Sequence, residues 1–251
     1  MPSDEVRHEL VAANHVLAHE NVLDVFGHVS VRDPSDPEIY LLSRACSPAN
    51  VTFEDIQRFT LDSRPVDPGA PQSYAERVIH GCIYRARPDV RAVVHFHALP
   101  VMPFCVTQVD LVPMSHVGAT MGRSVPRWNS QDEFGDTNLL VSTNEQGGSL
   151  ARALGPNWVV LMQNHGMTSA GRSLREAVFR TVQTCRNAEL QLSAIRLGAP
   201  TRLTEREIEL AGDFNLREPV LQRAWDYWLG RIGQTSQQAR TIDGTRGFAG
   251  S

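Results

Sequence analysis

The chain has 251 residues, of which 41% are hydrophobic and 21% charged, and its formal net charge is -4. This is an ordinary globular composition, long enough for one sizeable core without a second domain. It has no basic patch for nucleic acid, no apolar stretch long enough to span a membrane, and no signal-peptide pattern in its first residues, so we expect a cytoplasmic protein with a small-molecule partner.

The N-terminal part of the chain predicts a helix followed by three strands. Hydrophobic residues recur at helical spacing from Asp4 to about Glu20, and Ser3 is a candidate N-cap. The first two strands flank the turn Asp33-Pro34-Ser35-Asp36-Pro37 and therefore resemble a hairpin. The three strands are expected over residues 26–32, 39–42 and 58–61.

The next segment predicts a helix and a strand before a long irregular region. Ser73 and Glu76 have the spacing of a capping box, which starts a helix that Pro88 ends. An apolar strand is expected over 93–97. Residues 113–136 are rich in glycine and proline, and this composition indicates a functional or interface loop.

The C-terminal part is mainly helical. A helix is expected near 148–154 and a strand over 158–162, after which Ser173 and Glu176 form a second S-x-x-E pattern that opens a long helix through Leu197. Two further helices are expected to begin at Thr204 and Glu218. We therefore predict one α/β domain over 1–232, with a mainly antiparallel sheet and helices on its faces, and a polar, disordered tail over 233–251.

Three histidines near strand ends are candidate metal ligands. His95 and His97 are two residues apart, so on an extended strand their imidazoles point to the same face. His165 follows the second apolar strand, and neutral imidazoles bind several first-row divalent metals. The alternative for His95 and His97 alone is one face of a half-buried strand, and Glu76 is the additional residue that favours a metal site.

The chain contains no lysine, so all 24 residues counted as Lys+Arg are arginines. Schiff-base aldol chemistry, pyridoxal phosphate anchoring and a P-loop each need a lysine amine, and these mechanisms are excluded. A divalent metal acting as a Lewis acid is the remaining way to stabilise a carbanion.

An ordered set of short motifs resembles the class II aldolase/adducin family. The resemblance runs from the first predicted helix through Pro200. It implies a three-layer α/β/α fold and a homotetramer with active sites between neighbouring subunits. It also implies one divalent ion per subunit (Zn, Mn, Fe or Co) on His95, His97 and His165, with Glu76 as a further ligand or as the general acid/base. The motifs are Ser73-x-x-Glu76, His80, Ile83-Tyr84, Arg87-Pro88-Asp89-Val90, His95-x-His97 and Asn164-His165-Gly166.

Two segments depart from the sugar-phosphate aldolases of that family. Those aldolases have a Gly-Asn-x-Ser segment and small hydroxyl residues before the acidic residue, which hold the substrate phosphate. This chain has Gly27-His28-Val29-Ser30 in the first place and Tyr74-Ala75 in the second. Tyrosine and alanine offer poorer phosphate contacts than two serines, so these departures disfavour a phosphorylated sugar.

The Gly-His-x-Ser-x-Arg variant is instead similar to a branch of the family that acts on aromatic acids. This resemblance implies a metal-dependent lyase that decarboxylates a hydroxylated aromatic or heteroaromatic carboxylate. The alternatives are a metal-dependent aldolase or epimerase on a non-phosphorylated hydroxy-carbonyl compound, and a non-haem iron oxygenase acting on a hydroxyphenyl acid. A structural, adducin-like protein would be expected to have lost the four metal-site residues.

Several other residues are candidates for catalysis or substrate binding. The proton donor is expected among Glu76, His28 and His116, the last reaching from the long loop into a neighbouring subunit's site. Simpler alternatives are a hydrogen-bonded structural role for His28, an ordinary loop position for His116, a solvated Arg44, and helix packing for Tyr227. The substrate-binding candidates are Ser43, Arg44, Ser73, Tyr74 and Tyr227.

Overall fold

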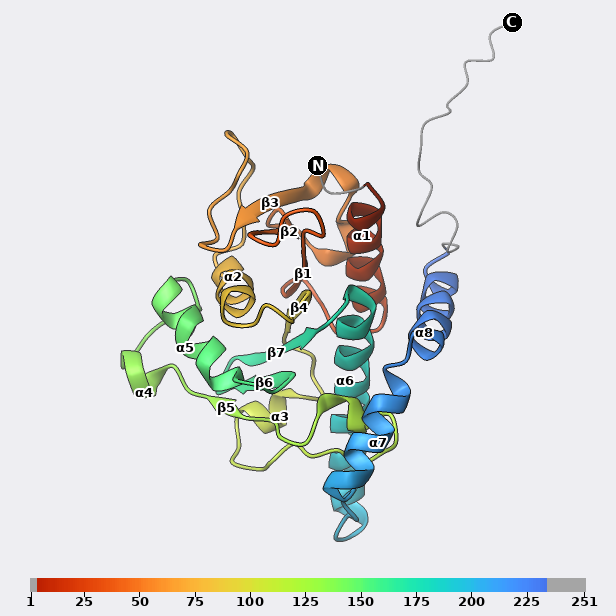
Figure 1. Ribbon diagram of the computed structural model, residues 1–251. Helices are drawn as coiled ribbons and strands as arrows, with labels where there is room; N and C mark the ends of the chain where they lie inside the picture. The colour runs from red at the N-terminus through yellow and green to blue at the C-terminus, as the bar shows by residue number, and fades with distance from the viewer. Residues whose placement is uncertain (1–3, 234–251) are drawn as a thin grey trace, which may run out of the picture.

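The structure is a computed structural model that describes residues 4–233, so the predicted tail, apart from Gly233, lies outside the described residues. Its strands are β1 (His28–Arg32), β2 (Ile39–Ser43), β3 (Ile56–Thr60), β4 (Ala92–Phe96), β5 (Arg127–Trp128), β6 (Val159–Met162) and β7 (Gly166–Gly171). They form one seven-stranded sheet in the order β3-β2-β1-β4-β7-β6-β5, in which only β5 and β6 are parallel neighbours (Figure 1). The centre of the sheet thus joins strands from distant parts of the sequence.

Helices cover both faces of this sheet. The longer ones are α1 (Asp4–His19), α2 (Arg77–Ala86), α5 (Asn144–Leu154), α6 (Leu174–Leu197), α7 (Glu205–Asn215) and α8 (Glu218–Arg231). The shorter ones are α3 (Met102–Cys105), α4 (Gln131–Phe134), and the 3-10 turns η1 (Pro48–Asn50), η2 (Phe53–Asp55) and η3 (Gly118–Met121). Helices α1 and α6 pack on one face and α2 and α5 on the other, with α8 against α1 and α6 (Figure 1). The predicted three-layer α/β/α fold is confirmed.

Side-chain alternation along the central strands decides what each face of the sheet presents. On β4, Val94 and Phe96 belong to the core under α1 and α6, whereas Val93 belongs to the core under α2 and α5. Because alternate residues share a face, His95 lies on the same side as Val93, toward α2. The first histidine of the pair is therefore directed toward the helix that follows Glu76.

Most predicted elements are present, and two strands were not predicted. The N-terminal helix, the β1–β2 hairpin and the long helix through Leu197 are confirmed. Strand β7 has the sequence Gly-Met-Thr-Ser-Ala-Gly, whose small residues have low strand propensity, yet it is buried throughout between β4 and β6. The short strand β5 lies inside the region predicted as an irregular loop. None of the helices in the described part of the chain combines the length and apolar character of a membrane span.

The capping box predicted at Ser73 and Glu76 is wrong. Helix α2 begins at Arg77 with Glu76 as its N-cap, and no side chain caps it. The Ser73 hydroxyl instead donates to Gln57 Oε1 over 3.0 Å, and the Glu76 carboxylate accepts from the Val141 backbone N–H over 3.1 Å. Both side chains are held by tertiary contacts, which leaves Glu76 directed away from its own helix.

The second predicted box forms only in part. Ser173 caps α6 by accepting from the backbone N–H of Glu176, but the Glu176 carboxylate forms an ion pair with the buried Arg180 rather than returning to the helix start. A buried guanidinium needs a charged partner, and this requirement outweighs the local capping bond. Helix α5 begins at Asn144, earlier than predicted, behind a complete box made by Thr143 and Gln146.

Candidate metal centre and its surroundings

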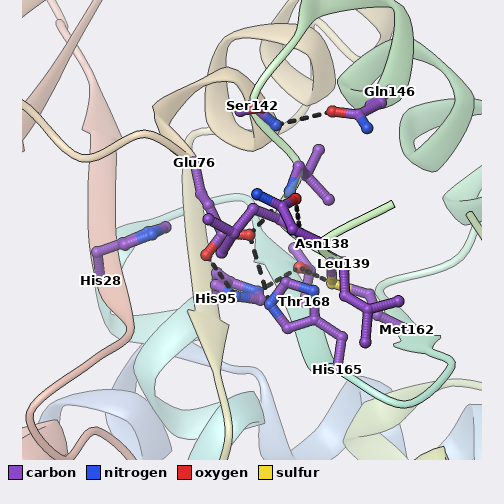
Figure 2. Close-up of polar contacts among 12 residues, drawn as sticks. His28, Glu76, His95, Asn138, Leu139, Ser142, Gln146, Met162, His165 and Thr168 are labelled. Atoms are coloured by element: carbon purple, nitrogen blue, oxygen red, sulfur yellow. Dashed lines mark hydrogen bonds and ion pairs between the residues drawn. The ribbon is translucent and has the colours of Figure 1, made fainter. Parts of the chain in front are cut away.

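Four side chains from separate parts of the fold meet at one end of the central strands. Glu76 precedes α2, His95 lies on β4, His97 follows β4, and His165 lies in the turn between β6 and β7. One ligand atom from each residue lies within 4.8 Å of the others. Glu76, His95 and His165 are visible together in Figure 2. The structure thus brings together all four residues that the sequence suggested as metal ligands.

The turn that carries His165 is built to approach His97 closely. Asn164 has a φ of 57°, a left-handed conformation that asparagine tolerates better than most residues. A Cβ added at Gly166 would lie 2.6 Å from both His97 Cδ2 and the Phe96 carbonyl oxygen. Only glycine allows this approach, which gives the Asn164-His165-Gly166 motif a direct geometric reason.

The carboxylate of Glu76 lies among the imidazoles. Its oxygens are 3.6 Å from His95 Nε2 and 3.4 Å from His165 Nε2. Burial alone would raise the pKa of Glu76, but the interactions with His95 and His165 outweigh it and hold this pKa well below its usual value. Glu76 is therefore ionised in the resting site.

The imidazoles of His97 and His165 are neutral at physiological pH. Burial, assisted by the neighbouring His95, lowers the pKa values of His97 and His165 to about 4 each. A neutral imidazole retains the lone pair that a metal ligand needs. His97 and His165 therefore offer neutral nitrogen donors, and Glu76 offers an anionic oxygen donor.

Hydrogen bonds around His95 determine which of its nitrogens faces the cluster. His95 Nδ1 lies 3.2 Å from Thr168 Oγ1, and the Thr168 hydroxyl donates to Met162 Sδ over 3.3 Å. Since the hydroxyl hydrogen is used on Met162, His95 Nδ1 is the donor to Thr168, and its Nε2 faces the Glu76 carboxylate at 3.6 Å. That Nε2 is buried without a partner within hydrogen-bond distance among the described residues.

The unpartnered His95 Nε2, which faces the Glu76 carboxylate, fits a bound cation. Buried polar atoms are normally satisfied, and leaving them unpaired costs free energy. Three imidazoles and a carboxylate are a donor set that zinc and other first-row divalent ions accept, and they do not by themselves select one metal. The residues present therefore fit a divalent metal.

Replacing Thr168 with valine should weaken metal binding by about 10- to 100-fold, the usual effect of removing a partner that orients a metal-binding histidine. Valine has nearly the shape of threonine but cannot accept from His95 Nδ1, so this imidazole loses its fixed tautomer. Titration of the metal-free protein with zinc gives the affinity. Thr184→Val is the matched control, because Thr184 is also buried but its hydroxyl has no partner in the described part of the chain; equal losses in both variants would contradict the prediction.

Two predicted residues lie directly beside this cluster. The His28 ring is fully buried on β1, with its centroid 5.2 Å from that of His95 and 4.6 Å from that of Tyr74. Burial lowers the pKa of His28 well below its ordinary value, so it too is neutral. The Tyr74 hydroxyl donates to the Cys46 carbonyl, which fixes this ring against His28. Aromatic side chains therefore form one wall next to the cluster.

The other predicted substrate contacts are held by the protein itself or lie elsewhere. Ser43 is buried at the end of β2, and Arg44 Nε donates to Asp55 over 2.5 Å. Within one chain, His116 packs against Phe214, with ring centroids 5.9 Å apart, and is absent from the four-residue cluster.

Tyr227 also lies apart from the cluster in the single chain. It is 56% exposed on α8, and the Arg231 guanidinium lies over its ring. Its neighbours Trp225 and Trp228 are buried, so the helix-packing alternative holds for these two and not for Tyr227.

Two contacts of the cluster were not predicted from the sequence. The Val141 N–H reaches Glu76 from the segment before α5, and a backbone donor has no sequence signal. Thr168 lies on the unpredicted strand β7, opposite His95 in the register of the sheet. His80 and Tyr84 appeared only as motif positions, but their spacing of four residues within α2 places both on one helix face.

Comparisons with known proteins identify the family to which this chain belongs. The model of the class II aldolase and adducin N-terminal domain matches residues 8–192. Decarboxylase tropJ of Talaromyces stipitatus is 31% identical over 244 residues, which cover 88% of this chain and 92% of that protein. The 3,4-dihydroxyphthalate decarboxylase of Arthrobacter keyseri is 29% identical over 248 residues, 90% of this chain and 93% of that protein. An aldolase II superfamily protein from Pseudomonas syringae has the same fold, with a TM-score of 0.77, 23% identity and 96% of each chain covered. The chain belongs to the class II aldolase and adducin family.

Proposed function

We propose that this protein is a metal-dependent decarboxylase of hydroxylated aromatic or heteroaromatic carboxylates. The observation that carries the proposal is the cluster of Glu76, His95, His97 and His165 lying beside the aromatic wall of His28 and Tyr74. Both relatives described above bear the name decarboxylase, and one of them is named for a dihydroxylated aromatic acid, 3,4-dihydroxyphthalate. The protein is accordingly an enzyme of the carbon–carbon lyase class.

The surroundings of the cluster suit a flat ring better than a phosphate. Ser73 already donates its hydroxyl to Gln57, and Ala75 has no hydroxyl to offer. The half-buried phenol ring of Tyr74, supported by the buried imidazole of His28, instead provides an apolar face on which an aromatic substrate can pack. These contacts support an aromatic acid over a sugar phosphate.

The reaction needs stabilisation of negative charge and one proton transfer. A divalent cation held by the three histidines and Glu76 would supply Lewis-acid stabilisation of the substrate oxygens. When the carboxylate leaves as CO2, the electrons of the broken carbon–carbon bond remain on the ring carbon, which must gain a proton. Glu76 is ionised in the resting site, so it first accepts the proton of a ring hydroxyl and then delivers it to that carbon.

Anaerobic CO2 release from a panel of ortho-hydroxy aromatic acids tests this proposal. Purified protein is loaded separately with Zn, Mn, Co or Fe(II), and metal content is measured in each sample. We expect CO2 and the ring-protonated product with at least one metal. No CO2 from any fully loaded sample would overturn the proposal. Aldehyde release from a hydroxy-carbonyl compound would indicate the aldolase alternative, and Fe(II)-dependent oxygen consumption the oxygenase alternative.

We further propose a homotetramer in which a neighbouring subunit completes each site. His116 and Tyr227 lie away from the cluster in the single chain, and the apolar side chains of Phe26 and Leu99 are 67% and 84% exposed. Leu99 lines a cavity of about 480 Å³ together with His97, so this apolar surface borders the metal site. Light scattering gives the oligomeric state. Recovery of activity on mixing inactive His116→Ala and Glu76→Gln subunits would support shared sites, and a monomeric active enzyme would exclude them.

A further inference from the structure

A buried chain of hydrogen bonds begins at His28 and runs away from the candidate metal centre. His28 and Ser30 are two apart on β1 and share a face, while His80 and Tyr84 are four apart on α2 and share a face. Because the two faces pack together, the four side chains alternate between strand and helix. Figure 2 shows His28 extending from β1 toward Glu76 and His95, at the cluster end of this chain.

The chain is short, direct and closed to solvent. His28 Nδ1 lies 2.6 Å from His80 Nε2, His80 Nδ1 lies 2.6 Å from Ser30 Oγ, and Ser30 Oγ lies 2.6 Å from the Tyr84 hydroxyl. The exposed fractions of these residues are at most 2%. Burial also lowers the pKa of His80 to about 3, so this imidazole is neutral and carries one hydrogen.

Each of these bonds needs one hydrogen, and because a hydroxyl oxygen can accept twice, this count leaves three arrangements. In the first, Tyr84 donates to Ser30, Ser30 donates to His80 Nδ1, and His80 Nε2 donates to His28 Nδ1. In the second, all three bonds are reversed, so that His28 Nδ1 donates to His80 and Ser30 donates to Tyr84. In the third, His28 Nδ1 donates to His80, His80 Nδ1 donates to Ser30, and Ser30 also accepts from Tyr84. The first arrangement leaves the hydrogen of His28 on Nε2, whereas the second and third place it on Nδ1.

The first arrangement is the one that satisfies every donor. The Tyr84 hydroxyl has Ser30 as its one hydrogen-bond partner within residues 4–233. In the second arrangement the Tyr84 hydrogen, and in the third the Ser30 hydrogen, would be buried without an acceptor among the described residues, which costs more than leaving an acceptor lone pair free. The direction of the whole hydrogen-bond chain is therefore set by the two hydroxyls at the end that lies farthest from the cluster.

We propose that His80, Ser30 and Tyr84 are positioning residues that hold His28 in the tautomer with its hydrogen on Nε2, so that His28 presents a fixed hydrogen-bond donor to the substrate. His28 Nε2 makes no hydrogen bond with the described residues, and its ring packs between Tyr74 and His95. The donor is thus available to an anionic oxygen of a substrate at the cluster. Only this last step, the identity of what it binds, rests on the proposed decarboxylase function.

The same chain of hydrogen bonds makes His28 a poor proton donor in the reaction. If the Nε2 hydrogen left, His28 would become an anion unless His80 passed a hydrogen to Nδ1. That transfer would have to continue through Ser30 and leave Tyr84 as a buried tyrosinate, although burial raises the pKa of Tyr84 well above its ordinary value. His28 therefore holds an oxygen in place and stabilises its charge, while Glu76 remains the residue that moves the proton.

Nitrogen NMR of the wild-type, metal-free protein tests the tautomer without any activity. The protein is labelled with 15N-histidine, and the His28 and His80 signals are identified by their loss in the His28→Gln and His80→Gln variants. We expect a hydrogen on Nε2 and a bare Nδ1 for both residues. A hydrogen on His28 Nδ1 would overturn the proposal whatever reaction the enzyme catalyses, so its failure is distinguishable from failure of the proposed function.

Kinetics of variants along the chain test whether the position of His28 matters for catalysis. His80→Phe removes the bond to His28 while keeping a ring, and we expect kcat to fall about 10- to 100-fold with metal content unchanged. Tyr84→Phe should produce a smaller loss of kcat, because Ser30 can still donate to His80. The control is Tyr40→Phe, which removes another buried hydroxyl of the same core, one bonded to Ser63 and to the Arg77 carbonyl. Losses confined to stability, with kcat equal to that of Tyr40→Phe, would show a merely structural chain.

Discussion

Glu76→Gln is expected to lower kcat by about 100- to 10,000-fold, the range associated with loss of a positioned acid/base group. Glutamine keeps the shape of the side chain and can still accept from the Val141 N–H. It cannot take up the proton of a substrate hydroxyl, and it removes the negative charge that lies 3.4 Å from His165 and 3.6 Å from His95. The variant should therefore lose both catalysis and part of its affinity for metal.

The two losses separate when kcat is measured at saturating metal, with the bound ion quantified in the same sample. A fully loaded Glu76→Gln enzyme that turns over at the wild-type rate would show that Glu76 carries no proton. The matched control is Glu54→Gln, because Glu54 is an exposed glutamate in the turn before β3. Its kcat and metal content should equal those of the wild type.

The strand histidines could be predicted because their signal is local and periodic. Residues two apart on a strand share a face, and the run before His95 is apolar enough to identify that strand without other information. His165 and Glu76 needed the family motif, because spacing alone does not reveal that the β6–β7 turn and the start of α2 meet at the end of β4. The order of the strands in the sheet brings these segments together, and the sequence alone does not reveal that order.

The prediction at Ser73 and Glu76 failed for a related reason. A capping box is defined by four consecutive residues, and the sequence satisfies that definition. In the folded protein, however, Glu76 interacts with two imidazoles and a backbone N–H from distant segments. Interactions of a carboxylate with charged or chargeable groups are stronger than a neutral capping bond, so the local pattern is overridden at the functional site.

Strand β7 was missed because its residues are small rather than because its pattern is weak. Neighbouring backbone atoms leave no space for a Cβ at Gly166 or Gly171. An added Cβ would lie 2.6 Å from the Phe96 carbonyl oxygen at Gly166 and 2.6 Å from the Ala177 backbone nitrogen at Gly171. Strand propensity rewards bulky residues, whereas this strand is buried on both sides, between neighbouring strands and under α6. Because β7 was not predicted, Thr168, which orients His95, was not identified from the sequence.

The metal-free protein should lose stability steeply between pH 6.5 and about pH 4. The folded-state pKa values of His97 and His165 are about 4 each, and that of His80 is about 3, all below the value of 6.5 that applies to an unfolded chain. As pH falls, the unfolded chain therefore binds protons before the folded protein does. The stability from these neutral imidazoles is fully present above pH 6.5 and is lost progressively as the pH falls toward the folded-state pKa values. One pH unit corresponds to about 1.4 kcal/mol, so the free energy of unfolding should fall by about 3 kcal/mol for each of His97 and His165.

Urea unfolding of the metal-free protein at a series of pH values measures this loss. His97→Gln should reduce the slope of the unfolding free energy against pH by up to about 1.4 kcal/mol per unit in this window, whereas replacement of the exposed His19 by glutamine should leave it unchanged. A pH-independent free energy of unfolding down to pH 4 would contradict the buried, neutral imidazoles.

Bound metal should steepen the pH dependence of the unfolding free energy, because the ion requires the same neutral nitrogens. At 100 times its Kd the ion adds about 2.7 kcal/mol near neutral pH, and protons that compete for the histidines remove this gain as the pH falls. The same four side chains thus couple metal loading, acid stability and the ionised state of Glu76.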